Sequence, residues 1–334
     1  MVPVLDSKKN PIMPCSEKRA RKLMERGDAK PYWCKGLFCI ILQREPSSRD
    51  TQEIVVGVDP GSKWEGFTVK SEAHTLLNVQ TSARTDVKKK METRKNMRRN
   101  RRQRKLRCRK WRFNRKRRKG WIAPSTKSRW DHKISLINWF RKMYRVSIVA
   151  IENIAAVSKK GCRKWNKSFS PLEVGKNYFR DWISSQSLKL YEYQGYETAD
   201  IRNGIGLKKN SKKSKQDFYT HCVDSWCMAN DVIGGHLLPE NVRTTFLKPL
   251  VFFRRQLHVQ TPTNGGKRKN YGSTRSLGFS RGTLVRHMKH GLALIGGTSK
   301  SRVSLHCLRG GKRLCQNAKD SDIQILTRFN FNIN

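Results

Sequence analysis

The chain is short of acidic residues. Its 334 residues include 25 Asp and Glu against 72 Lys and Arg, which gives a formal net charge of +47. Positive charge in such excess opposes compaction through self-repulsion unless a polyanion neutralises part of it. Nucleic acid is the polyanion that this composition favours. Only 36% of the residues are hydrophobic, which predicts two or three small domains with large surfaces covered by solvent or ligand.

Long hydrophobic runs are missing as well. No stretch approaches the roughly 18 apolar residues of a membrane-spanning helix, and the first residues show neither a signal-peptide pattern nor an amphipathic anchor. A membrane surface would also attract this charge, but nothing in the sequence would anchor the chain there. We therefore expect a cytoplasmic protein with no membrane partner.

Paired cysteines at metal-binding spacing are also absent. The nine cysteines are scattered, with no C-x-x-C pair and no zinc-finger cluster. We expect reduced thiols with structural roles, and a zinc site is the less favoured alternative.

Glycine and proline are absent between Gly66 and Gly120, and 21 of the 36 residues from 84 to 119 are Arg or Lys, with Asp86 and Glu92 as the only acids. Their few apolar side chains form no stripe wide enough to pack on a core. A charge run is usually a disordered tail. This one lies between two core-like segments, so we expect a helix that phosphates stabilise on more than one side.

The other segments carry ordinary patterns. The amino-terminal unit is predicted as a strand, a turn, a helix that begins at Ser16 and stops before Gly27, and a second strand, followed by a linker. Three short runs then predict a meander, and an amphipathic helix leads into a continuous apolar strand. The carboxy-terminal part predicts a small β domain. The ranges are 2–5 (strand), 7–14 (turn), 36–43 (strand), 44–52 (linker), 54–80 (meander), 123–144 (helix), 146–154 (strand), 158–219 (polar, mixed), 217–235 (helix) and 248–334 (β domain).

Three acids share one peculiarity. Asp59, Glu152 and Asp224 each interrupt an otherwise apolar segment, in the order strand, strand, helix. A single buried acid is as often paired to an arginine as it is functional. Three like charges buried together are very costly unless a cation lies among them, which favours a divalent metal.

Carboxylate oxygen is the ligand that Mg²⁺ prefers, and two such ions can activate water and stabilise the leaving oxygen in phosphodiester hydrolysis. We therefore expect two Mg²⁺ ions, with Mn²⁺ as a substitute, on Asp59, Glu152 and Asp224. His221 precedes Asp224 by three residues, so on one helix both would project to the same side. It could orient the attacking water or protonate near it, although a lone histidine is usually structural.

These segments resemble the RuvC-like branch of the RNase H fold: IVVGVDPGS for its first motif, IVAIENI for its second and HCVDSW for its third. The Arg-rich segment is similar to the bridge helix of RNA-guided nucleases. NPIMPCSEKRARKLMERGDA resembles the amino-terminal PLMP unit of the transposon-encoded IscB and IsrB proteins, with Ile12 where leucine is usual. RRQLHVQTPTNGGKRKNYGSTRS, residues 254–276, is similar to the start of their carboxy-terminal domain.

One absence separates these relatives. IscB carries an HNH nuclease between the second and third RuvC motifs, yet the chain has no histidine from Asn153 to Thr220. An HNH domain cannot lie there, so the sequence looks like IsrB, the form with one nuclease. The resemblance implies an RNA-guided nickase that cuts the non-target strand.

The resemblance also implies the architecture. We expect an α/β protein with an RNase H-like (RuvC) nuclease core, an inserted bridge helix, a small PLMP domain and a small β-rich carboxy-terminal domain. The expected boundaries are 1–50 (PLMP), 51–83 (RuvC part I), 84–120 (bridge helix), 121–160 (RuvC part II), 161–247 (RuvC part III with a basic segment) and 248–334 (domain that contacts the motif flanking the target).

The implied partners are a large structured guide RNA, of the omega RNA kind, and duplex DNA with a flanking motif. Base pairing would read the sequence while the protein holds the backbone. We expect a monomeric protein in a ribonucleoprotein, prokaryotic and associated with the nucleoid. The expected nucleic-acid contacts are Arg98, Arg101, Arg102, Lys105, Arg109, Arg112, Lys208, Lys209, Arg254, Arg255, Lys267, Arg268 and Tyr271.

Two alternatives stay open. A non-catalytic RNA-binding protein would explain the basic helix and the β domain, but it gives no reason for the three acids. A junction resolvase would use the same metal centre on branched DNA without RNA.

Overall fold

The computed structural model describes most of the chain, and the chain divides into two compact units. One unit comprises Met1, Lys8–Pro14 and Pro46–Phe246, and the other comprises Val2–Ser7, Cys15–Glu45 and Leu247–Asn334. The described residues are 1–104, 120–155, 170–212, 214–249, 275–276, 279–280, 282–299, 302–308, 312–328 and 331–333.

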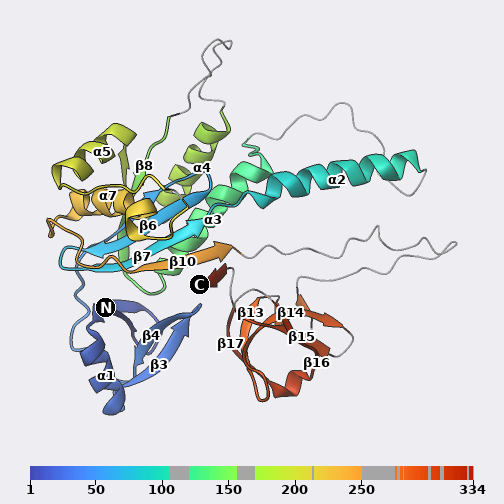
Figure 1. Ribbon diagram of the computed structural model, residues 1–334. Coiled ribbons are helices and arrows are strands. Elements are labelled where there is room, and N and C mark those ends of the chain that lie inside the picture. The colour runs from blue at the N-terminus through green and yellow to red at the C-terminus, as the bar shows by residue number, and fades with distance from the viewer. Residues whose placement is uncertain are drawn as a thin grey trace, which may run out of the picture. The chain divides into compact units, whose positions relative to one another are not determined.

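The first unit is built on a mixed sheet. Its antiparallel meander, predicted from the sequence, is confirmed as β5 (Ile54–Asp59), β6 (Trp64–Ser71) and β7 (Thr75–Ser82). The predicted apolar strand is β8 (Val146–Glu152), which runs parallel to β5, and β9 (Lys189–Tyr193) runs parallel to β8. With β10 (Thr244–Pro249), the strand order is β10-β7-β6-β5-β8-β9 (Figure 1).

Helices cover both faces of this sheet because neighbouring side chains on a strand point to opposite sides. On one face, Phe67 of β6 packs on Phe140 of α3 (Pro124–Phe140), with ring centroids 6.0 Å apart. Trp130 of α3 in turn packs on Phe179 of α4 (Pro171–Ser185). On the other face lie α5 (Gly195–Gly204), α6 (Phe218–His221) and α7 (Val223–Ile233).

The Arg-rich segment begins as a helix. Helix α2 (Asp86–Gln103) is labelled in Figure 1. It contains nine Lys or Arg side chains and two acids, and none of its residues is buried. The sequence-based prediction of a helix without a core-facing stripe is confirmed over this range. Residues 105–119, the rest of the predicted helix, lie outside the described residues.

The amino-terminal elements follow their local signals, except that the strands at Pro11–Cys15 and Ala29–Cys34 were not predicted. Helix α1 (Glu17–Glu25) has Ser16 as its N-cap, whose side chain accepts a bond from the Arg19 N–H, and Gly27 follows with φ +74°. Strands β1 (Val2–Leu5) and β4 (Leu37–Leu42) are parallel, and β3 (Ala29–Cys34) runs antiparallel to β4. The prediction of a turn over 7–14 is wrong in part, because β2 (Pro11–Cys15) is a strand there.

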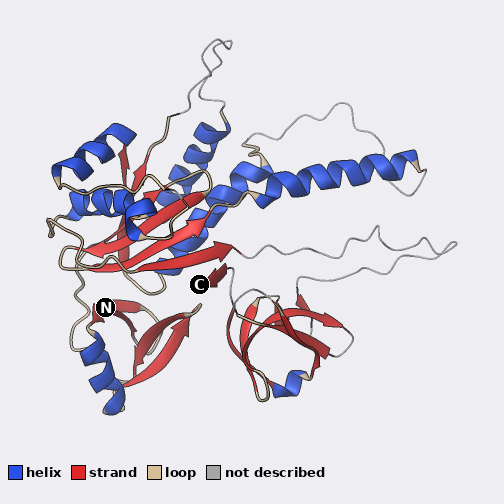
Figure 2. Cartoon of the chain, viewed as in Figure 1, coloured by secondary structure: helices blue, strands red, loops and turns tan. Residues whose placement is uncertain are grey.

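The described residues of the carboxy-terminal segment lie mostly in strands, as predicted (Figure 2). Its antiparallel sheet has the order β16-β15-β14-β13-β17, around a core that includes Val285, Ile295 and Leu305. The short strand β18 (Phe331–Ile333) pairs with the end of β10. The remaining strands are β11 (Arg275–Ser276), β12 (Phe279–Ser280), β13 (Thr283–His287), β14 (Gly291–Ser299), β15 (Arg302–His306), β16 (Arg313–Ala318) and β17 (Ile323–Arg328).

Two further observations bear on the sequence-based expectations. The cysteines within the described ranges are all free thiols, and Cys222 and Cys227 belong to an apolar cluster with Trp226. Among the described helices, none combines the length and the apolar composition that a bilayer crossing requires.

Candidate active site

Asp59 and Glu152 lie at the same edge of the sheet. Asp59 is the last residue of β5 and Glu152 is the last residue of β8. These strands are parallel neighbours, and Val58 is paired with Ile151. Asp59 and Glu152 are the next residues of the two strands, so they lie side by side. Adjacent parallel strands thus deliver two carboxylates to one place at their carboxyl ends.

Asp224 reaches the same place because α6 and α7 lie unusually close to the sheet. A Cβ on Gly57 would be 1.8 Å from the Ser225 carbonyl oxygen, and a Cβ on Gly66 would be 1.7 Å from the His221 carbonyl oxygen. Gly66 is the cross-strand partner of Asp59, so both face the same helices. The missing side chains let Asp224, in the first turn of α7, pack over Asp59.

Buried polar contacts fix α7 in this position. The Thr68 and Ser225 hydroxyl groups are 2.9 Å apart, and the Ser225 hydroxyl donates to the Cys222 carbonyl. At the other end of α7, the ammonium group of buried Lys70 donates to the Gly234 carbonyl at 2.6 Å. Side chains of β6 therefore form hydrogen bonds at both ends of α7.

Two cationic side chains bind the acids. The Arg202 Nη1 atom of α5 is 2.7 Å from Asp224 Oδ1. The Lys209 Nζ atom contacts Asp224 Oδ2 in a short ion pair and lies 3.4 Å from Asp59 Oδ2. The ammonium group of Lys209 thus bridges two of the three predicted acids, and each oxygen of Asp224 has its own cation.

The electrostatics show that the three acids share one site. Burial and the charges of Asp59 and Asp224 raise the pKa of Glu152 to about 7. Burial also raises the pKa of Asp59, an effect that Lys209 opposes and Asp224 reinforces. Asp59 is 8% exposed and Asp224 is 5% exposed, so little solvent screens this repulsion.

Helix α5 approaches the third acid. A Cβ on Gly195, its first residue, would lie 3.0 Å from Glu152 Oε1. The absence of a side chain at Gly195 therefore leaves room for the Glu152 carboxylate. The partial positive charge of a helix amino terminus also favours a negative group at this point.

His221 ends α6 instead of lying on one continuous helix with Asp224, because Cys222 separates α6 from α7. Cys222 keeps helical dihedral angles, so the chain still turns in the helical direction there. The His221 ring is buried beside Trp64 of β6, with centroids 6.1 Å apart.

A second buried polar group lies under the opposite face of the sheet. The Lys133 ammonium group of α3 is 2.6 Å from Glu65 Oε1, and both side chains are almost fully buried. The other Glu65 oxygen has no hydrogen-bond partner. Burial raises the pKa of Glu65, Lys133 opposes this shift, and the Asp59 charge adds to it, which links this pair electrostatically to the acidic cluster.

The three acids offer carboxylate oxygens, which are the ligands that a hard divalent cation prefers. A positive group, the Lys209 ammonium, already lies between two of these acids. Their arrangement is that of a site closed around an ammonium group. Among the residues that the structure describes, no group of three His, Cys, Asp or Glu side chains is placed to hold a metal ion. Binding of Mg²⁺ by Asp59, Glu152 and Asp224 therefore requires Lys209 to move aside.

The predicted nucleic-acid contacts fall in three groups. Arg98, Arg101 and Arg102 lie on α2, where none of the side chains is buried. Lys208 is exposed, whereas the neighbouring Lys209 has the carboxylate partners described above. The remaining predicted contacts lie outside the described residues: Lys105, Arg109, Arg112, Arg254, Arg255, Lys267, Arg268 and Tyr271.

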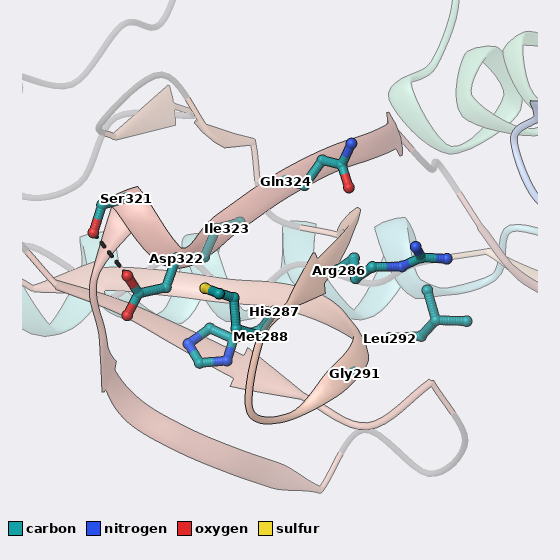
Figure 3. Close-up of a pocket in the computed structure, with 9 residues that line it drawn as sticks. All are labelled: Arg286, His287, Met288, Gly291, Leu292, Ser321, Asp322, Ile323 and Gln324. Carbon is teal, nitrogen blue, oxygen red and sulfur yellow. Dashed lines mark hydrogen bonds between the residues drawn. The ribbon is translucent and has the colours of Figure 1, made fainter.

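The carboxy-terminal sheet carries a pocket of about 530 Å³ beside the β13–β14 turn. Figure 3 shows Arg286 and Gln324 on neighbouring strands and the Ser321 hydroxyl bonded to Asp322. His287 Nδ1 accepts bonds from the Lys289 and His290 N–H groups, which fixes the turn. None of the predicted contacts lines this pocket.

Sequence reasoning missed Arg202, Gly195 and the site role of Lys209. Arg202 lies in a segment without a clear pattern, and Lys209 is one of several lysines in a basic run. The signal that could have indicated Lys209 is charge balance, because carboxylates that lie together with little access to solvent need nearby cations.

The family model described as RRXRR protein matches residues 2–160. That range contains β5, β8 and α2, and residues 98–102 of α2 read RRNRR. No curated protein matches the sequence.

Among solved structures, the chain is similar to Thermus thermophilus RuvC in complex with a Holliday junction substrate, with 12% identity and a TM-score of 0.30 over 55% of this chain and 98% of that chain. A second Thermus thermophilus RuvC structure gives 13% identity and 0.26 over 53% and 90%. The yeast mitochondrial Holliday junction resolvase gives 10% and 0.27 over 55% and 78%. By the match to the family model, the chain is similar to the RRXRR proteins from residue 2 to residue 160.

Proposed function

We propose that the chain is a metal-dependent DNA endonuclease of the RNA-guided IsrB type, which nicks the non-target strand at one RuvC-like centre. The observation that carries this proposal is that β5, β8 and α7 bring Asp59, Glu152 and Asp224 to one edge of the sheet, where Asp59 and Asp224 are buried and Glu152 is half-buried. A binding protein with no chemistry to perform gains nothing from gathering three mutually repelling carboxylates with little access to solvent.

In this mechanism Asp59, Glu152 and Asp224 would hold Mg²⁺, which would supply activation of water and stabilisation of the leaving oxygen. Burial of Asp59 and Asp224 would strengthen their attraction for the cation. His221, one turn before Asp224, orients the attacking water or donates a proton beside it. The strand assignment and the guide RNA rest on the resemblance of the motifs to the IsrB proteins.

The cationic surface of α2 fits the recognition of a nucleic-acid backbone. Its arginines present planar guanidinium groups that bind phosphate in a bidentate manner. Sequence would be read by base pairing with the guide RNA, and the carboxy-terminal domain would contact the flanking motif.

The test begins with the RNA that co-purifies with the full chain, which is sequenced to identify the guide. A supercoiled plasmid with a matching target is then incubated with the complex and Mg²⁺. We expect open-circle product without linear product, and none after Asp59→Asn or with EDTA. Asp181→Asn, which changes an exposed aspartate of α4, serves as the charge-matched control.

The alternatives give different outcomes in the same experiment. Nicking of a branched junction by RNA-free protein would favour a junction resolvase. Unchanged RNA binding with no cleavage under any divalent cation would favour a non-catalytic RNA-binding protein.

A further inference from the structure

The acidic cluster contains its own cation. The Lys209 ammonium group contacts Asp224 Oδ2 and lies 3.4 Å from Asp59 Oδ2, between two acids that come from different elements. Without a positive charge there, the two carboxylates would repel each other at short range in a site with little solvent. Lys209 thus holds the acids together when no metal is bound.

The two cations on Asp224 differ in how easily they can leave. Arg202 belongs to helix α5, its side chain is 18% exposed, and its guanidinium group binds Asp224 Oδ1. Lys209 lies in a segment between α5 and α6 that is neither helix nor strand, and its side chain is 34% exposed. A lysine on such a segment has a flexible four-carbon stem, so it can withdraw while Arg202 stays in place.

Metal binding and the Lys209 contact exclude each other. A divalent ion on Asp59 and Asp224 needs the oxygens that Lys209 uses, and the ion would repel the ammonium group. The protein therefore has two exclusive states, one with Lys209 on the acids and one with the metal on them. The apparent affinity for the metal is lower when the state with Lys209 on the acids is more populated.

We propose that Lys209 is a built-in counter-cation that closes the acidic cluster in the metal-free protein and competes with the divalent metal for Asp59 and Asp224. This inference rests on the proposed function, because it takes the three acids as the metal ligands. Once displaced, the Lys209 side chain is free to turn toward solvent, where the phosphate of a bound strand is its natural partner.

The test is a titration of the RNase-treated full chain with Mn²⁺, followed by electron paramagnetic resonance of the free ion. We expect Lys209→Met to bind Mn²⁺ about 10-fold more tightly than the wild type, as the loss of one charge-assisted hydrogen bond from the metal-free state predicts. The same variant should melt at a lower temperature without metal and recover when Mn²⁺ is added. Lys209→Arg, which keeps the cation, should bind Mn²⁺ as the wild type does.

Lys208→Met is the matched control, because it removes the same charge from the exposed neighbouring position. Its Mn²⁺ affinity should stay close to that of the wild type. Equal or weaker binding by Lys209→Met, with binding still abolished by Asp59→Asn, would overturn the role of Lys209 and leave the proposed function intact. Unchanged Mn²⁺ binding by Asp59→Asn would overturn both.

Discussion

At the scale of single residues, glycine decides where the carboxylates meet. Gly57 and Gly66 lie on adjacent strands and face helices whose backbone oxygens occupy the space of a side chain. Any side chain there would push α7 away from the sheet and move Asp224 away from Asp59. The site therefore depends on residues that carry no functional group.

The first prediction concerns Gly57→Ala. We expect it to lower the free energy of unfolding by about 1–3 kcal/mol, the usual cost of forcing extra volume into a packed interior. Urea unfolding of the full chain measures the change. Gly204→Ala in α5, where nothing lies within 4 Å of the new Cβ, is the control and should be neutral or slightly stabilising. Equal stability of the Gly57→Ala protein would contradict the close packing.

The second prediction concerns His132 of α3. Burial lowers its pKa to about 3, and the cations of Lys133 and Arg84 add to this shift. The folded state keeps His132 neutral while the unfolded chain protonates it near pH 6.5, so stability is present above that pH and is lost as the pH falls toward 3. Between pH 7 and pH 5 the loss should be about 2 kcal/mol.

The measurement compares urea unfolding of the wild type and His132→Gln at both pH values. The difference between the two proteins isolates His132, since other titrating groups, including Glu152 with its opposite sign, are common to both. Equal pH dependence of the two proteins would show that folding leaves the pKa of His132 unchanged, which contradicts the prediction.

At the scale of elements, a helix or strand could be predicted from the sequence where its local residue pattern matches its burial in the fold. The meander, β8 and α3 were predictable because burial on one or both sides leaves an apolar pattern, and α1 because Ser16 and Gly27 mark its ends. β9 was missed because it is an edge strand with exposed residues, and α4 because Gly175 interrupts it. Gly175 is required by packing, since a Cβ would be 1.9 Å from the Trp130 indole nitrogen.

The acids of the site were predictable and their cations were not. Asp59, Glu152 and Asp224 stand out in sequence because each breaks an apolar run. Arg202 and Lys209 occupy polar segments of a very basic chain, where one cation cannot be told from another. Only the approach of α5 and the following segment to the sheet edge selects them.

The third prediction belongs to α2, whose fully unburied, cationic surface we expect to bind phosphates. Arg98→Gln and Arg101→Gln should each reduce the slope of log affinity against log salt by about 0.9 for duplex nucleic acid. Filter binding across a salt series measures the slope. Arg21→Gln on exposed α1 is the control. Slopes that match the wild type would exclude contacts from these two side chains.

At the scale of the whole molecule, the charge of +47 is the dominant fact. Self-repulsion on this scale favours expanded states, and bound polyanion reverses the effect. A large structured RNA would supply both the neutralising charge and part of the scaffold that encloses a guide–target duplex.

The fourth prediction follows from that charge. RNase treatment should reduce the mass of the purified particle and lower its melting temperature by several degrees, as a loss of about 2 kcal/mol would do in a chain of this size. Added salt should restore part of the loss by screening. Light scattering and calorimetry measure the two quantities, and an unchanged mass and melting temperature would mean that no RNA scaffold is present.

The central claim is that Asp59, Glu152 and Asp224 form one divalent-metal site. Anomalous scattering from crystals of the full chain grown with Mn²⁺ tests it most directly. The account predicts a manganese peak within coordination distance of these carboxylates, with the Lys209 side chain displaced and Arg202 still on Asp224. A crystal in which Lys209 remains between Asp59 and Asp224 at saturating Mn²⁺, with no peak beside them, would contradict it.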